Sequence, residues 1–215
     1  MIEAAALDLD GTLLNSEQVW YEIHRDVFRT YGIIITPKLY KECWIKTNKG
    51  AAGLCKEFGI PLEEIRAQKR TKWEERKMDV QLMPGAQELI ERLYQNFRLA
   101  VVSSSYRQSV QTALREILRA EDKIEVVVAY EDITNTKPDP EPYRKGRMLL
   151  GLQPHQCIAI EDAEKGVISA TEDGLHCIAV PNEWTSDGDF SRADAVVKSL
   201  NDITLEMIEE ISNKP

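Results

Sequence analysis

Short apolar runs alternate with amphipathic helical patterns along most of this 215-residue chain. The first run, Glu3–Leu9, is interrupted only by acidic residues, and runs of this kind are typical of strands buried on both faces of a parallel sheet. Five further runs follow, the last of them weaker: Leu99–Ser103, Ile124–Ala129, Cys157–Ile160, Cys177–Val180 and Ala193–Val197. Helical patterns cover Ala86–Tyr94, Gln108–Leu118, Pro142–Leu150, Lys165–Glu172 and the region near Leu205–Ile211. We therefore predict a three-layer α/β core built on a parallel sheet.

The segment from residue 15 to residue 80 interrupts this alternation, because its only patterns are helical. Apolar residues such as Trp20, Ile23 and Val27 recur at helical spacing, and turn signals such as Tyr31-Gly32 separate the patterns. We predict a helical cap domain at 15–80, inserted after the first strand into a core formed by 1–14 and 81–215. The insert has 13 basic and 10 acidic residues, a net charge of +3, and the remainder has 14 − 26 = −12.

The overall charge excludes some classes of partner. Lys and Arg total 27 against 36 Asp and Glu, so the formal charge is −9, which repels nucleic acids and anionic membranes. The four cysteines show no CxxC spacing, the N-terminus lacks a basic signal-peptide region, and no uncharged run approaches the roughly 20 residues of a membrane span. We expect a cytoplasmic monomer that binds neither nucleic acid nor membranes.

Two acids, Asp8 and Asp10, lie at the end of the first expected strand within the sequence DLDGTL. Residues i and i+2 of a strand face the same side, so both carboxylates can face one site at the carboxyl edge of the sheet. Two adjacent carboxylates repel each other unless a cation lies between them, and oxygen ligands beside a phosphorylated substrate favour Mg²⁺. The motif by itself is equally compatible with a solvated turn.

Three later motifs occupy equivalent places in the pattern. The run Ser103–Ser105 follows the second core strand, Lys137 lies in KPDP on a loop before a helix, and the pair Glu161-Asp162 follows the strand Cys157–Ile160. Each motif also occurs in ordinary surface loops. Their common position at strand ends nevertheless predicts that hydroxyls, a cation and four carboxylates converge on one edge of the sheet.

With DLDGTL, VVSSS, KPDP and IED in this order, the chain resembles the haloacid dehalogenase superfamily from Asp8 to Val180. The resemblance is to the branch with a helical (C1) cap, which includes phosphatases and β-phosphoglucomutase-like proteins. It implies a Rossmann-like core, Mg²⁺ as cofactor and an aspartyl-phosphate intermediate. The implied catalytic residues are Asp8 as nucleophile, Asp10 as general acid/base, Ser103 as hydrogen-bond donor to the phosphate and Lys137 as charge-neutralising cation. The implied metal ligands are Asp8, the backbone carbonyl of Asp10, Glu161 and Asp162.

Two reactions remain open within this resemblance. Asp10 favours phosphate-ester chemistry, because dehalogenase relatives lack an acid at that position. Mutases of the branch have a cap histidine where this chain has Trp20, and His24 lies one helical turn further on. We predict a phosphatase acting on a small phosphorylated metabolite, of the sugar or polyol phosphate class, with a sugar phosphomutase as the alternative. A binding protein that retains an inactive fold is the third hypothesis.

The remaining predicted site residues are expected to contact the substrate. Gly11 would permit the tight turn that brings Asp10 over the bond being broken. The other expected contacts are Thr12, Ser104, Ser105 and Arg107 in the core, and Trp20, Thr47, Asn48 and Lys49 in the insert. Lys49 and Arg107 are candidates for binding a second phosphate, as in a mutase, although both are also compatible with solvated surface charge.

Overall fold

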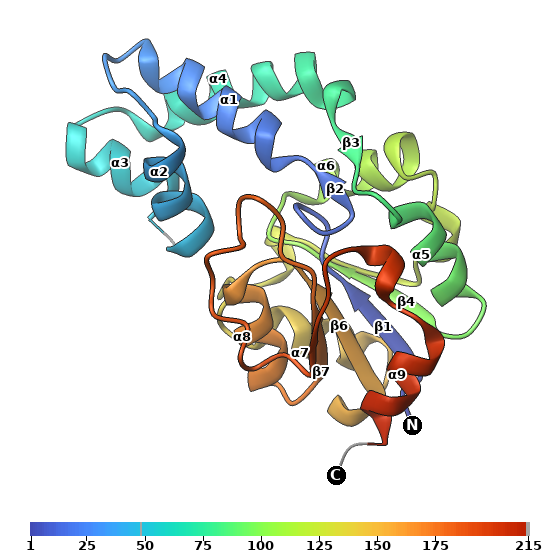
Figure 1. Cartoon of the computed structure of the whole chain (residues 1–215). Coiled ribbons are helices and arrows are strands. Elements are labelled where there is room, and N and C mark those ends of the chain that lie inside the picture. Colours follow the sequence, from blue (N-terminus) through green and yellow to red (C-terminus); the bar gives the residue numbers. More distant parts are fainter. Residues whose placement is uncertain (48, 214–215) are drawn as a thin grey trace. The chain divides into compact units, whose positions relative to one another are not determined.

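The computed structural model describes residues 1–47 and 49–213 and contains two compact units. Unit 1 comprises Met1–Leu14 and Leu82–Pro215, and unit 2 comprises Asn15–Gln81 (Figure 1). The chain crosses between the units through β2 (Leu14–Asn15) and β3 (Gln81–Leu82), which form a two-stranded sheet. Two-residue strands are too short to show alternation, and the sequence pattern therefore did not predict this sheet.

Unit 1 is built on a six-stranded parallel sheet with the order β5-β4-β1-β6-β7-β8, which confirms the predicted α/β fold class. The strands are β1 (Ala4–Leu7), β4 (Arg98–Val102), β5 (Val126–Val128), β6 (Cys157–Glu161), β7 (His176–Ala179) and β8 (Ala195–Val196). The first strand pairs with β4 on one side and β6 on the other, with Leu7 opposite Val101 and Ile160. Its carboxyl end therefore lies between the ends of those two strands.

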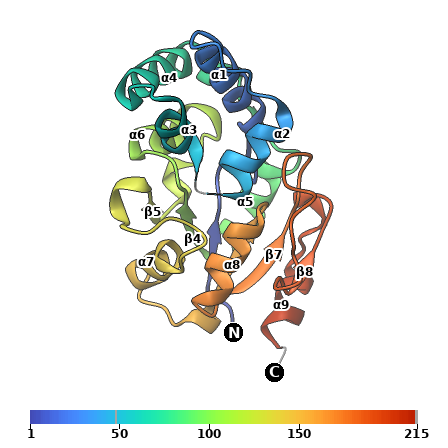
Figure 2. The ribbon, with the colours of Figure 1, turned by 90° about the vertical axis from the view of Figure 1, so that its left-hand side faces the viewer.

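Helices cover both faces of the sheet. They are α5 (Ala86–Tyr94), α6 (Arg107–Thr112), α7 (Glu141–Leu149), α8 (Glu164–Glu172) and α9 (Leu205–Ser212), with short 3₁₀ turns at η4 (Glu121–Lys123), η5 (Tyr130–Asp132), η6 (Pro154–Gln156) and η7 (Leu200–Asp202). Helices α7 and α8 lie on one face (Figure 2), and α5 and α9 lie on the other (Figure 1). The expected helix Gln108–Leu118 changes to a π-helix, η3 (Ala113–Ile117), where the Leu118 N–H donates to the carbonyl of Ala113, five residues back.

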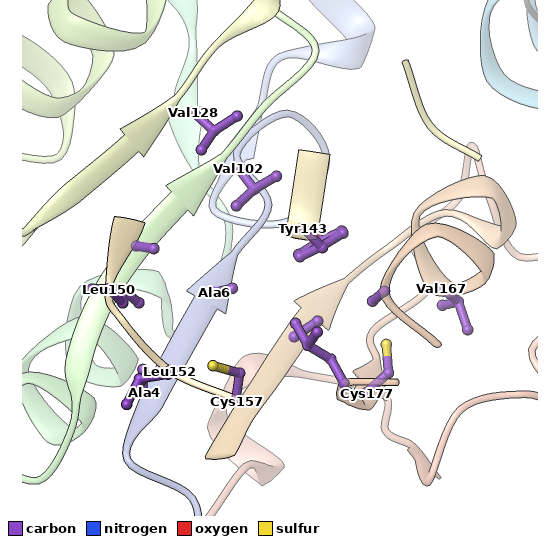
Figure 3. Close-up of a cluster of buried hydrophobic side chains, with 14 of the residues drawn as sticks. Ala4, Ala6, Val102, Val128, Tyr143, Leu150, Leu152, Cys157, Val167 and Cys177 are labelled. Atoms are coloured by element: carbon purple, nitrogen blue, oxygen red, sulfur yellow. The ribbon is translucent and has the colours of Figure 1, made fainter. Parts of the chain in front are cut away.

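Small side chains fill the central strands on the face covered by α7 and α8. Ala4 and Ala6 of β1 belong to a buried cluster that includes Tyr143 of α7 and Val167 of α8 (Figure 3). Gly146 of α7 adds to this close packing, because a Cβ at that position would lie 3.1 Å from the side chain of Val102. The core of unit 1 is therefore thin where α7 crosses the sheet.

Unit 2 is helical throughout its described interior, as the sequence predicted. Its elements are α1 (Glu17–Arg29), α2 (Pro37–Tyr40), the π-helix η1 (Lys41–Lys46), α3 (Gly50–Phe58), α4 (Leu62–Arg76) and the 3₁₀ turn η2 (Lys77–Asp79). The predicted turn at Gly32 is present, with a left-handed φ of 75° that favours glycine. Aromatic rings add to its aliphatic packing: Trp20 of α1 stacks on Trp73 of α4 with ring centroids 4.3 Å apart.

Two further sequence observations can be compared with the structure. All four cysteines are buried. Within residues 1–47 and 49–213, the structure contains no helix with both the length and the apolar character needed to cross a membrane.

Candidate active site

The carboxyl ends of β1 and β6 bring three acids together. Asp8 follows β1, and its N–H still donates to the carbonyl of Ile160 on the neighbouring strand. Glu161 is the last residue of β6, and Asp162 follows it. One carboxylate oxygen from each of Asp8, Glu161 and Asp162 lies within 4.8 Å of the others, and all three residues are buried. The sequence had predicted this convergence of the two acidic motifs.

Lys137 lies between two of these acids, Asp8 and Glu161, although it comes from the loop before α7. Its Nζ donates to Asp8 Oδ1 and Glu161 Oε1, both at 2.6 Å, and to the carbonyl of Val102 at 2.9 Å. Burial opposes a charge on Lys137, but attraction to the Asp8 and Glu161 carboxylates outweighs it and raises the pKa of the ammonium above its ordinary value. The ammonium is therefore held in its charged form between two strand ends.

Asp8 presents one engaged and one unpaired oxygen. Burial and the nearby Glu161 raise the pKa of Asp8 to about 8, against the opposing effect of Lys137. Its Oδ2 is buried and has no hydrogen-bond partner among the described residues. A buried oxygen without a donor is costly unless a ligand supplies the interaction, so Oδ2 is the Asp8 oxygen available to a bound molecule. The atoms that could hold a metal ion here, one from each of Asp8, Glu161 and Asp162, all belong to carboxylates. This all-oxygen set fits a hard divalent cation such as Mg²⁺.

Asp10 lies near the end of β4, but strand alternation, which the sequence suggested, does not position it. Strand β1 ends at Leu7, so the turn at Gly11, rather than the alternation of a strand, positions Asp10. Its Oδ2 accepts hydrogen bonds from Ser105 Oγ at 2.7 Å and from Ser103 Oγ at 3.4 Å. The structure thus places both serine hydroxyls on Asp10, whereas Ser104 is exposed.

The turn after Asp10 packs directly against Asp162. Gly11 has a φ of 88°, and a Cβ at this position would lie 2.4 Å from Asp162 Oδ2, so a larger residue cannot be accommodated there. The hydroxyl of the buried Thr12 donates to Asp162 Oδ1 at 3.3 Å. Both residues, expected to contact substrate, therefore also hold a predicted metal ligand.

Two residues that the sequence motifs did not reveal contact the acids. The buried Tyr143 hydroxyl donates to Glu161 Oε1 at 2.6 Å, and Lys137 Nζ lies 4.9 Å from the centroid of the Tyr143 ring. Asn182 Nδ2 donates to Asp162 Oδ2 at 2.9 Å. Tyr143 occupies a core position of α7, where an apolar residue would satisfy the helical pattern equally well, so the pattern does not reveal its hydroxyl. Asn182 follows β7, and a search of every strand end for polar residues would have found it.

Several other predicted contacts have partners elsewhere. The guanidinium of Arg107 pairs with Asp132 and donates to the carbonyl of Val127, on the β5 side of unit 1. In unit 2, Lys49 forms an ion pair with Glu57 at 2.5 Å, and the Thr47 hydroxyl donates to the carbonyl of Glu42 at 2.7 Å. Asn48 lies outside the described residues.

His24, the only histidine in the sequence of the insert, is buried beside the aromatic rings of unit 2. Its Nδ1 donates to the carbonyl of Trp20 at 2.6 Å, and its ring lies 4.3 Å from that of Trp44 between centroids. Burial, reinforced by the charge of Lys69, lowers the pKa of His24 well below its ordinary value. Trp20 itself stacks on Trp73, so both residues contribute to the packing of unit 2.

A parallel α/β core whose strand ends gather these acids, a lysine and serines defines a hydrolase acting on phosphorylated small molecules. The chain belongs to the haloacid dehalogenase-like hydrolases, whose family model matches residues 6–180. This match confirms the resemblance seen in the sequence motifs.

Individual relatives cover almost the whole chain. Validoxylamine A 7'-phosphate phosphatase of Streptomyces hygroscopicus subsp. limoneus is 28% identical over 207 residues, which cover 94% of this chain and 96% of that protein. The phosphorylated carbohydrates phosphatase of Thermotoga maritima is 27% identical over 206 residues, covering 94% and 88%. Among solved structures, CbbY from Rhodobacter sphaeroides in complex with phosphate has a TM-score of 0.87 at 25% identity, covering 97% of this chain and 100% of that one.

Proposed function

We propose that this protein is a Mg²⁺-dependent phosphatase of small sugar or polyol phosphates that acts through an aspartyl-phosphate on Asp8. The observation that carries the proposal is the unequal environment of the two Asp8 oxygens. Lys137 holds Oδ1, while Oδ2 is buried without a hydrogen-bond partner among the described residues. A fixed carboxylate with one available oxygen is the arrangement that nucleophilic attack on phosphorus requires.

The residues that would hold Mg²⁺ are Asp8, Glu161, Asp162 and the backbone carbonyl of Asp10. When bound, the cation would withdraw charge from the phosphoryl oxygens. Lys137 contributes a second positive charge beside Asp8, which reduces the repulsion between an anionic carboxylate and an anionic phosphate. We infer that the Ser103 hydroxyl, buried at the end of β4, exchanges its hydrogen bond to Asp10 for one to a phosphate oxygen when substrate binds.

The reaction then proceeds in two displacements at phosphorus. Asp8 Oδ2 forms a bond to phosphorus while the bond to the ester oxygen breaks, and Asp10 donates a proton to the departing alcohol. In the second displacement Asp10 accepts a proton from water, which attacks phosphorus and releases inorganic phosphate and the Asp8 carboxylate. The contacts of Asp10 with Ser105 and Ser103 support its role, because they hold its carboxylate beside the strand ends.

We also propose that unit 2 is a cap domain that excludes water and selects the leaving group. Trp20, Thr47, Asn48 and Lys49 remain our candidates for contacts of the cap with the substrate, and Ser104 and Arg107 for contacts of the core. We further propose that the protein works as a cytoplasmic monomer.

The surroundings of the insert residues favour a phosphatase over a mutase. Trp20 occupies the place of the mutase histidine and stacks on Trp73, and His24 is buried. Lys49 and Arg107, the candidates for a second phosphate, already form ion pairs. The Thermotoga maritima relative named for phosphorylated carbohydrates supports the sugar phosphate class.

A panel of phosphate monoesters tests this proposal. The protein is incubated with Mg²⁺ and sugar, polyol, nucleotide and aromatic phosphates, and released phosphate is measured, with Asp8→Asn as the control. We expect the highest kcat/KM for a sugar or polyol phosphate and no release by the variant. Conversion of β-glucose 1-phosphate to glucose 6-phosphate with a bisphosphate activator would instead identify a mutase, and failure to release phosphate from any ester would overturn the proposal.

A further inference from the structure

Asn182 lies on the loop that follows β7 and reaches the end of the neighbouring strand. The N–H of Val180 donates to the carbonyl of Glu161 at 2.7 Å, which carries the chain past the β6 end. Two residues later, Asn182 Nδ2 donates to Asp162 Oδ2 at 2.9 Å and to the carbonyl of Gly11 at 3.0 Å. One side-chain amide thus connects the loop after β7, the end of β6 and the turn after Asp10.

The orientation of this amide is set by its oxygen. Asn182 Oδ1 accepts a hydrogen bond from the N–H of Trp184 at 2.7 Å, so the NH₂ group must face the opposite way. Its two hydrogens then meet two acceptors, Asp162 Oδ2 and the Gly11 carbonyl. The loop itself is closed by the Asn182 N–H, which donates to Thr185 Oγ1 at 3.0 Å.

The Asp162 carboxylate is consequently held from both sides. Thr12 donates to Oδ1 and Asn182 donates to Oδ2, which restricts rotation of the carboxylate plane. Both of these donors are neutral, so they orient the group without cancelling its charge. Asp8 and Glu161 differ, because both accept from the Lys137 ammonium.

We propose that Asn182 is a positioning residue for the cation site, which holds Asp162 and the Gly11 turn in the geometry that a divalent cation requires. The inference rests on the proposed function, because it concerns the metal of that same site. Residues that hydrogen-bond metal ligands commonly contribute roughly 10- to 100-fold to metal affinity. Removal of the amide is therefore expected to weaken cation binding.

Titration of the metal-free protein with Mn²⁺ tests this role without substrate, with free Mn²⁺ followed by electron paramagnetic resonance. We expect Asn182→Ala to raise the Kd for Mn²⁺ about tenfold and Asn182→Ser, which keeps one donor, to give an intermediate Kd. We expect the loss of kcat in both variants to become smaller as Mg²⁺ is raised from limiting to saturating concentration. The expected effect is thus a change in metal affinity. A residue that contributed only to folding would not change metal affinity in this specific way.

Two matched variants separate the amide from the loop and from general effects of an Asn to Ala change. Thr185→Val removes the hydroxyl that closes the loop but leaves the Asn182 amide, and Asn96→Ala removes an exposed amide that donates to the carbonyl of Arg92 at the end of α5. Both should bind Mn²⁺ like wild type. If Asn182→Ala and Asn182→Ser bind Mn²⁺ as tightly as wild type, or if Thr185→Val weakens binding equally, the role of the amide is overturned. Failure of the wild-type protein to bind Mn²⁺ would instead overturn the metal dependence in the proposed function.

Discussion

Tyr143 and Lys137 donate to the same oxygen of Glu161, each at 2.6 Å, and the Lys137 ammonium also lies over the Tyr143 ring. Burial and the Glu161 carboxylate raise the pKa of the Tyr143 hydroxyl well above its ordinary value, so the phenol remains a hydrogen-bond donor. Two donors engage Oε1, so Oε2 is the oxygen of Glu161 that a cation would contact. Tyr143 thus helps to set the orientation of a residue outside its own helix.

Replacing Tyr143 with Phe removes the hydroxyl but keeps the ring beside Lys137. A buried hydrogen bond to a charged group contributes about 1.5–3 kcal/mol, so we expect a loss of this size in the free energy of unfolding of the metal-free protein, measured with urea. We also expect kcat/KM to fall about 3- to 30-fold. Tyr143→Leu, which removes the ring as well, should be less stable than Tyr143→Phe. Equal stability and activity of Tyr143→Phe and wild type would contradict this interpretation.

Lys137 is expected to be necessary for folding as well as for activity. Lys137→Met leaves Asp8 and Glu161 buried without their shared cation, and such a loss commonly costs about 3–5 kcal/mol. The Tm of the metal-free variant should fall accordingly, and phosphate release should be undetectable. Adding Asp8→Asn to Lys137→Met removes one of the two unpaired charges and should recover part of the Tm. A double variant no more stable than Lys137→Met would show that charge repulsion is not the cause.

Gly11→Ala should impair catalysis far more than an equivalent change elsewhere. The new Cβ would meet Asp162 Oδ2 at 2.4 Å, and displacement of a reacting group by about 1 Å can cost roughly 100-fold in rate. We therefore expect kcat/KM to fall about 100-fold. Gly151→Ala is the matched control, because Gly151 also has a left-handed φ, of 71°, but a Cβ added there would have no atom within 4 Å. If kcat/KM fell by a similar factor in both variants, the cause would be backbone strain alone rather than the contact with Asp162.

His24 should make unit 2 sensitive to acid. Its pKa is lowered in the folded protein, so below about pH 6.5 the unfolded chain binds a proton that the folded chain does not. Stability then falls with decreasing pH, by up to about 1.4 kcal/mol per pH unit from this group. Urea unfolding of wild type and His24→Phe between pH 5 and 8 measures the difference. We expect the variant to have the shallower dependence below pH 6.5, and parallel curves would refute the assignment.

The alternation of apolar runs and helical patterns was sufficient to predict the parallel sheet and the helical insert. It also predicted that Asp8, Ser103 and Asp162 lie near one another, because parallel strands end at one edge. The π-helical ends of two helices were not predictable, since each π segment is only about one turn long, too short to alter the spacing of apolar residues visibly.

The partners of individual polar side chains were harder to predict. Arg107 and Lys49 were considered for phosphate binding, but their ion pairs with Asp132 and Glu57 depend on which acids the folded chain brings within reach. Tyr143 has no motif of its own, because burial of its ring satisfies the helix pattern whether or not a hydroxyl is present. Such contacts are set by three-dimensional packing rather than by spacing in the chain.

The small residues beneath α7 set how closely this helix lies on the sheet, and this spacing in turn affects a contact in the candidate active site. Ala6 and Gly146 allow α7 to lie close to the sheet, and Tyr143 on that helix then extends to Glu161. An added methyl group at either position would move the helix outward and withdraw the phenol from the carboxylate. Substitutions deep in an apolar layer can therefore alter the enzyme's rate without touching any group that meets the substrate.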